Sequence, residues 1–342
     1  MAGLRRKHIY GALALLTAIV ADTALAKEPG DFGQYIRGVT IGDPTGAAPP
    51  PGLYFENTTL WAPSAPGKGQ LAGFTVNAIV DVPLIYWSTG WKFLGASVSA
   101  ALAQSWFDLS VRNSAAAGPP FAGATLYPTV HNTWISPLIL SWNLGSGWFA
   151  SGGFAFFAPD GSRYNNTTNP DYWTFEPSAS ISYLGDGWDL TAHAVYEFNT
   201  SSAGHTGAFA GTPFAAFGVG YQSGDQFFVD LTATKKFGKW EIGPVAYLKW
   251  QTTEDKPGAG APCAAMSAAT FSLLTCGRQD HHAVGGLVGY DFGPVALKVF
   301  VTDTVFTRDD FEGLNIWTKL SFRLWAPETP EAPPAKRPLI HK

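Results

Sequence analysis

Polar side chains, several of them ionisable, recur at every second position in several segments of this 342-residue chain. From position 188 to 199 the even positions are apolar or aromatic, whereas nearly all odd positions are polar and include Asp189, His193 and Glu197. Carboxylates and imidazoles on one face can orient a hydroxyl or a carboxylate of a small molecule, and neighbouring aromatic rings can hold an apolar ring. The pattern therefore indicates a polar path rather than a catalytic constellation.

The same alternation in other segments supplies the remaining candidates for this path. A second interpretation is a structural network, because a narrow interior fills itself with paired charges and both signs are mixed here. The candidate residues are Glu176, His193, Glu197, Asp230, Lys236, Tyr247, Lys249, Lys298, Trp317, Lys319 and Arg323.

Strands must position these residues, because strict alternation is typical of β-structure. The expected strands are about 11 to 14 residues long, which exceeds the usual length in soluble sheets and suits a tilted crossing of a bilayer. We predict twelve of them, at residues 52–62, 71–87, 91–112, 132–143, 148–158, 173–184, 188–200, 222–236, 240–253, 282–291, 295–306 and 314–325. The alternation slips near Ala103, which predicts a bulge there.

Short and long connections alternate between these strands. The short turns are expected at residues 88–90, 144–147, 185–187, 237–239 and 292–294, and the other six connections are longer. Bacterial outer-membrane barrels have short periplasmic turns, long outer loops and an even number of strands. The sequence thus predicts an all-β fold, a transmembrane antiparallel β-barrel of about twelve strands.

Composition agrees with a barrel. Charged residues make up only 14% of the chain, compared with about 25% in ordinary soluble domains. No later stretch approaches 18 consecutive apolar residues, which disfavours helical membrane spans.

The N-terminus has the order of a secretory signal peptide: Arg5, Arg6 and Lys7, an apolar run, and small residues ending at Ala26. The apolar run of 13 residues is short for a membrane anchor, which needs about 20. Without residues 1–26 the chain keeps 19 Lys and Arg against 25 Asp and Glu, a net charge of −6. This charge disfavours nucleic acid as a partner.

The expected organisation therefore has four parts. Residues 1–26 are the signal peptide, and residues 27–51 either plug the lumen or lie in the periplasm. Residues 52–325 form the barrel, and residues 326–342 form a Pro-rich periplasmic tail.

The two cysteines, Cys263 and Cys276, lie close together in an exported chain and favour one disulfide. A zinc site with His281 and His282 is the weaker alternative, since the spacing is atypical. We predict no metal and no cofactor.

Two other classes of function remain as alternatives. A lipid-modifying barrel enzyme could use Ser201 or Ser202 with His205, but a flexible loop orients a nucleophile and its base poorly. A structural or adhesive envelope protein could use its loops, or the tail residues Lys336 and Arg337.

Four tryptophans follow expected short turns: Trp91, Trp148, Trp188 and Trp240. Amphipathic rings favour the boundary between lipid tails and headgroups. We expect these residues to form an interfacial girdle at the periplasmic end.

The segments "NPDYWTFEPSASISYL", "AVYEFNT", "GPVAYLKWQTTEDKPG" and "GYDFGPVALKV" resemble a family of outer-membrane proteins linked to the meta-pathway of phenol degradation. The resemblance covers residues 50–325 and departs from the family at 203–220, at 263–276 and in the tail. It implies an outer-membrane barrel, in contact with lipid and lipopolysaccharide, for uptake of small aromatic or other apolar molecules. We expect this transport to be passive, because the sequence shows no energy-coupling motif. The resemblance supplies no catalytic residue.

Overall fold

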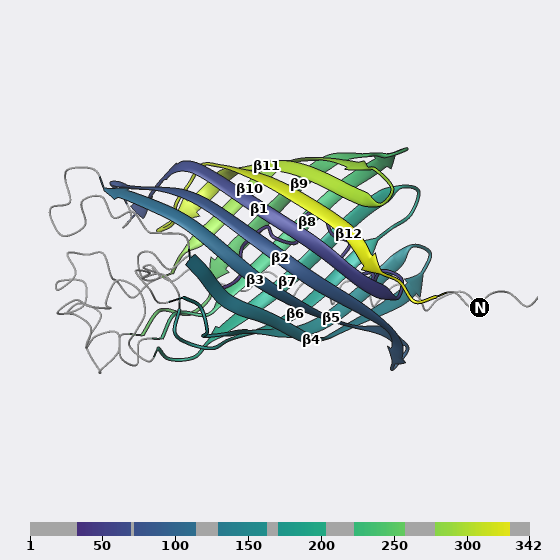
Figure 1. Ribbon diagram of the computed structural model, residues 1–342. Coiled ribbons are helices and arrows are strands. Elements are labelled where there is room, and N and C mark those ends of the chain that lie inside the picture. Colours follow the sequence, from purple (N-terminus) through teal and green to yellow (C-terminus); the bar gives the residue numbers. More distant parts are fainter. Residues whose placement is uncertain are drawn as a thin grey trace, which may run out of the picture.

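The alternating segments form strands that close into one antiparallel barrel (Figure 1). The computed structural model describes residues 33–69, 72–113, 129–162, 170–202, 222–256 and 278–328. The strands are β1 (Gly52–Pro66), β2 (Phe74–Phe93), β3 (Ala96–Asn113), β4 (Thr129–Gly145), β5 (Trp148–Ala158), β6 (Thr174–Tyr183), β7 (Trp188–Asn199), β8 (Gln226–Phe237), β9 (Trp240–Gln251), β10 (Asp280–Asp291), β11 (Val295–Arg308) and β12 (Leu314–Trp325).

Each strand pairs with its neighbours in sequence, and β1 closes the barrel by pairing with β12 from Leu53↔Trp325 to Trp61↔Ile316. Closure leaves no strand edge unpaired among these twelve strands. The prediction of a twelve-stranded antiparallel barrel is confirmed.

Side chains point alternately into and out of the barrel. On β8 the inward residues Asp230 and Thr232 are buried, whereas on β11 the outward residues Val299 and Val301 are exposed. An apolar outer face on a closed barrel is the arrangement that lipid requires. The described residues contain no helix with the length and hydrophobicity of a membrane span.

The short turns lie at one end of the barrel, which we call the turn end, and the longer connections lie at the other, the loop end (Figure 1). Three turns use two consecutive residues with positive φ, as in Asp186 (52°) and Gly187 (80°). This geometry matches the twist of a two-residue hairpin.

The turn predicted at residues 88–90 is wrong. Strand β2 continues to Phe93, and the chain reverses at Leu94 and Gly95. The pairing of β2 with β3 shifts between Ser88 and Lys92, so Gly90 lies in an irregular stretch of the strand and not in the turn. Trp91 consequently precedes its turn.

The bulge predicted near Ala103 has a counterpart in the pairing of β3 with β4. Their register shifts between Ser99 and Ala101 and again between Gln104 and Trp106. These shifts flank Ala103 and explain why the sequence alternation slips there.

Candidate functional site: the barrel lumen

Residues 33–51 lie inside the barrel and do not join the sheet. Hydrogen bonds connect this lumen segment to inward side chains of β7, β8 and β12 near its start, and of β4, β5 and β6 near its end. The segment thus crosses the interior from the loop end toward the turn end.

Asp230 of β8 is the main anchor of the lumen segment. Its carboxylate accepts bonds from the Tyr35 hydroxyl (2.9 Å), the Gly38 amide (2.9 Å), and the Thr40 amide and hydroxyl (3.1 and 2.7 Å). The Thr40 hydroxyl also lies 3.0 Å from Nδ1 of His193. One buried carboxylate therefore holds three residues within a stretch of six, and it does so firmly because charge-assisted bonds are the stronger kind.

A second carboxylate holds the start of the segment. Glu197 Oε1 accepts the amides of Gln34 (3.0 Å) and Tyr35 (3.4 Å). Glu176, on the neighbouring strand β6, accepts the indole N–H of Trp134 through Oε2 at 2.8 Å. Its other oxygen, Oε1, is buried and has no hydrogen-bond partner among the described residues.

Two lysines hold the segment from the opposite side of the barrel. Lys319 donates to the Val39 carbonyl (2.9 Å) and pairs with Asp43 and with Glu56 (3.3 Å). Lys298 donates to the Gly42 carbonyl and pairs with Glu241 at 3.1 Å. These cations satisfy carbonyls that a buried irregular backbone would otherwise leave unpaired.

Serine and threonine hydroxyls hold the end of the segment. The Thr45 hydroxyl lies 2.6 Å from that of Ser180, and the Gly46 amide donates to Ser182 (3.0 Å). Ser141 donates to the Gly46 carbonyl at 2.7 Å and accepts the Ala48 amide at 3.0 Å.

Glycines allow the segment to approach the wall closely. Gly38 has φ of 88°, and a Cβ there would lie 2.9 Å from a Tyr247 ring carbon and 3.2 Å from a Trp317 ring carbon. A side chain at this position would be strained and would also clash with buried rings.

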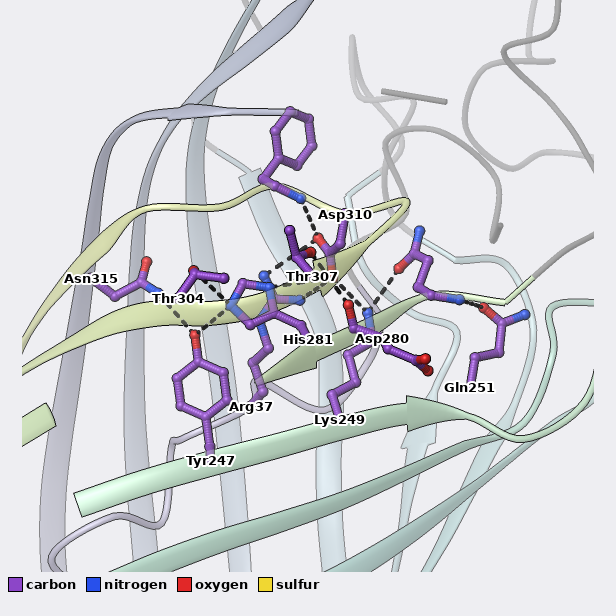
Figure 2. Close-up of polar contacts among 12 residues, drawn as sticks. Arg37, Tyr247, Lys249, Gln251, Asp280, His281, Thr304, Thr307, Asp310 and Asn315 are labelled. Carbon is purple, nitrogen blue, oxygen red and sulfur yellow. Dashed lines mark hydrogen bonds and ion pairs between the residues drawn. The ribbon is translucent and has the colours of Figure 1, made fainter. Parts of the chain in front are cut away.

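A charged cluster joins the segment to the loop end (Figure 2). Asp310, in the connection from β11 to β12, pairs with Arg37 (2.5 Å) and Lys249 (3.1 Å). Burial alone would raise the pKa of Asp310, but the attraction of Arg37 and then of Lys249 outweighs it, so that this pKa lies below its ordinary value. Beside it, His281 Nε2 lies 3.1 Å from the Tyr247 hydroxyl, which accepts a bond from Asn315 (2.9 Å).

The inner surface has two contrasting walls. The polar wall consists of buried polar residues of β6–β8, with the apolar Val195 and Phe228 among them: Glu176, Ser180, Ser182, Thr191, Glu197, Asp230 and Thr232. The apolar wall consists of the cluster of buried apolar residues of β1–β3: Ala62, Ala65, Val76, Ala78, Val80, Val82, Ala103, Phe107 and Leu109. Ile36 and Val39 of the lumen segment pack against the apolar wall.

A family model described as "Putative MetA-pathway of phenol degradation" matches residues 62–320. The chain belongs to this family. No curated protein matches this family member in sequence.

Solved structures similar to this family member are outer-membrane barrels. An outer-membrane channel from Pseudomonas putida F1 has a TM-score of 0.62 at 10% identity, covering 82% of this chain and 98% of that one. The translocator domain of the autotransporter NalP from Neisseria meningitidis has a TM-score of 0.42 at 10% identity, over 80% and 88% of the two chains. The first similarity supports the fold, and together with the apolar exterior it places this family member in the outer membrane.

The structure brings most candidate path residues of this family member to the lumen segment or to one another. Glu176, Glu197, Asp230, Tyr247, Lys249, Trp317 and Lys319 are each at most 3% exposed. His193 and Lys298 also face the segment. Lys236 and Arg323 are exposed near the turn end.

Sequence reasoning missed the apolar wall, Arg37 and Asp310. The signal for the apolar wall was present in β2, where Val76, Ala78, Val80 and Val82 share one parity. Asp81, at the opposite parity of that strand, faces outward and accepts bonds from Asn57 (2.7 Å) and Thr59 (2.6 Å). The polar path predicted for the lumen therefore does not extend to β2.

Several predicted features lie outside the described residues: the signal peptide, the tail, His205, and the pairing of Cys263 with Cys276. His281 and His282 are described, and they point to opposite faces of β10. Since one faces the lumen and the other the outside, both cannot join one zinc site. Within the described ranges no group of three His, Cys, Asp or Glu residues could hold a metal.

Aromatic rings surround the turn end. Trp148, Trp188 and Trp240 begin β5, β7 and β9 and are 43%, 39% and 51% exposed, while Trp91 is 66% exposed. Trp148 and Trp240 contact Tyr183 and Tyr290 at ring distances of 5.1 and 4.7 Å. These contacts extend the girdle predicted from four tryptophans to neighbouring strands.

Proposed function

We propose that this protein is an outer-membrane channel for passive uptake of small hydrophobic, aromatic compounds. The observation that carries the proposal is the apolar wall inside a closed barrel, because an interior that served only as a water-filled pore would be polar. The family match supports the same class of solute. The protein works in contact with outer-membrane phospholipid and lipopolysaccharide.

The turn end faces the periplasm and the loop end faces outward. Barrels of this class keep their short turns and both strand termini on the periplasmic side. The exposed tryptophans at the turn end then mark the inner interface of the membrane. Solutes meet the loop end first, where Arg37 and Asp310 hold the lumen segment.

The lumen segment restricts passage. It lies across the interior and is hydrogen-bonded to several strands of the wall. The segment therefore narrows the path that ions and solutes can take to the periplasm. Most of the inward charges serve this purpose: Glu197, Asp230 and Lys319 each bond to the segment. We therefore assign them to holding the segment rather than to contacting the solute.

Whole-cell uptake tests the proposed function. Cells with intact lipopolysaccharide that express the protein should take up radiolabelled naphthalene several-fold faster than cells with an empty vector. The rate should be proportional to concentration and unaffected by dissipating the proton gradient, since transport is passive. Equal uptake with and without the protein would contradict the proposal.

We assign no catalytic residue. Of the residues considered for a lipid-modifying enzyme, Ser202 donates its hydroxyl proton to Asp171 at 2.6 Å. This carboxylate accepts a hydrogen bond from the serine. A nucleophilic serine instead needs an oriented histidine as its base. Purified protein should therefore not deacylate phospholipid, and turnover that is lost in Ser202→Ala would overturn this assignment.

A further inference from the structure

We propose that the apolar wall, together with Glu176, forms the solute-binding site, and that it takes flat apolar molecules carrying one hydroxyl group. Ile36 and Val39 of the lumen segment occupy this site when no solute is bound. The inference rests on the proposed function and deepens it by naming the residues that select the solute.

The apolar wall is continuous across three strands. Ala78 pairs with Ala62 on one side and with Leu109 on the other, and Val80 pairs with Phe107. All nine wall residues are at most 7% exposed. From Val76 to Val82 the wall extends about 20 Å along β2 at the rise of a β-strand. Such a surface can hold an apolar ring at successive positions.

The segment is attached to the two walls by different interactions. On the polar wall its backbone amides donate to Glu197, Asp230 and Thr232, in addition to the packing of Tyr35 and Val39 against Val195 and Phe228. On the apolar wall the contacts are the side chains of Ile36 and Val39. A solute that replaces apolar side chains leaves no buried polar group unpaired, whereas replacing the amides on the polar wall would leave carboxylates without partners. Displacement therefore favours the apolar wall.

Glu176 of the polar wall is connected to the apolar wall through Trp134 of β4. Trp134 packs against the apolar wall and donates its indole N–H to Glu176 Oε2 at 2.8 Å. Glu176 is 2% exposed, and its Oε1 has no hydrogen-bond partner in the part of the chain that the structure describes. Buried acceptors are rarely left unpaired. A solute hydroxyl that donates to Oε1 would satisfy this oxygen while its ring lies on the apolar wall beside Trp134.

Uptake of two matched probes tests the site. Naphthalene and 2-naphthol share a ring system and differ by one hydroxyl. Val80→Thr keeps the size of the side chain but places a hydroxyl on the apolar wall, and it should slow uptake of both probes about fivefold, because burying an unpaired hydroxyl is unfavourable. Glu176→Gln replaces one acceptor oxygen by a donor, and it should slow 2-naphthol about tenfold relative to naphthalene, since bonds to carboxylates are strong.

Val299→Thr makes the same change on the lipid face, where Val299 is 40% exposed, and it is the matched control. The apolar wall is not the site if Val80→Thr takes up both probes as fast as Val299→Thr. The role of Glu176 is refuted if Glu176→Gln changes both probes equally, because loosening the segment would do that. If wild-type protein accelerates neither probe, the proposed function itself fails. Heat-dependent gel mobility confirms that each variant is folded.

Discussion

The apolar wall of β1–β3 and the polar wall of β6–β8 have the same backbone architecture and opposite chemistry. Both are inner faces of tilted antiparallel strands, yet the first buries Val, Ala and Phe, while the second buries mainly carboxylates and hydroxyls. The lumen segment contacts the first by apolar side chains, whereas on the second it adds many hydrogen bonds to the packing of Tyr35 and Val39. The difference shows that alternation sets the direction of a side chain, whereas the neighbour inside the lumen determines its polarity.

The largest expected effect comes from removing the segment that separates the walls. Deletion of residues 33–48 should raise the single-channel conductance several-fold, because the hydrogen-bonded chain across the interior is gone. Planar-bilayer recordings measure it, with gel mobility as a control for folding. An unchanged conductance would show that the segment does not limit passage.

A smaller effect is expected from weakening the polar wall alone. Asp230→Asn keeps the shape but replaces one carboxylate oxygen by a donor, so the four bonds that the two oxygens accept from Tyr35, Gly38 and Thr40 cannot all form. The state in which the segment lies across the lumen should be destabilised by about 2 to 3 kcal/mol, which is typical for the loss of bonds to a buried charge. The measurement is the fraction of time spent in the high-conductance state.

Asp303→Asn is the control for that variant. Asp303 is exposed on the outer side of β11, and in the described part of the chain its carboxylate accepts a hydrogen bond from the neighbouring Thr304 amide. If both variants open the channel equally, the polar wall has no special role in holding the segment.

The smallest effect concerns the pairing of Arg37 with Asp310. Because the pKa of Asp310 is lowered, its stabilising effect is complete above the pKa of an unfolded aspartate, about 3.9. It is lost only as the pH falls through the lower, folded value. The coupling between Arg37→Ala and Asp310→Ala, measured by a double-mutant cycle on channel opening, should therefore be the same at pH 7 and pH 5. A coupling that disappears at pH 5 would refute this account of the pair.

Much of the fold could be predicted from the sequence because its signals are local. Strands 148–158 and 314–325 have the predicted bounds, since Gly-containing turns and period-2 alternation both act over a few residues. The turn at 88–90 was wrong for the same reason: Gly90 resembles a turn residue, but the pairing of β2 with β3 continues past it to Phe93. Tertiary pairing outweighed the local signal.

The site was less predictable because its contacts span the chain. Parity predicts that Lys236 and Arg323 point away from the lipid face, and they do, yet both are exposed near the turn end. Parity gives the direction of a side chain but not its position along the barrel axis. The bond from the Gly38 amide to Asp230 joins residues 192 positions apart. No periodicity encodes such a pairing.

A reversible tether between the lumen segment and the polar wall tests the central claim most directly. The hydroxyls of Thr45 and Ser180 are 2.6 Å apart, so cysteines at both positions can form a disulfide. In a background with Cys263→Ser and Cys276→Ser, oxidation of the Thr45→Cys, Ser180→Cys variant should reduce 2-naphthol uptake several-fold, because a solute that has displaced Ile36 and Val39 still needs the end of the segment to move before it reaches the periplasm. Reduction should restore it, and neither single-cysteine variant should respond. Formation of the disulfide with no change in uptake would contradict the account, because the segment would then not control passage through the lumen.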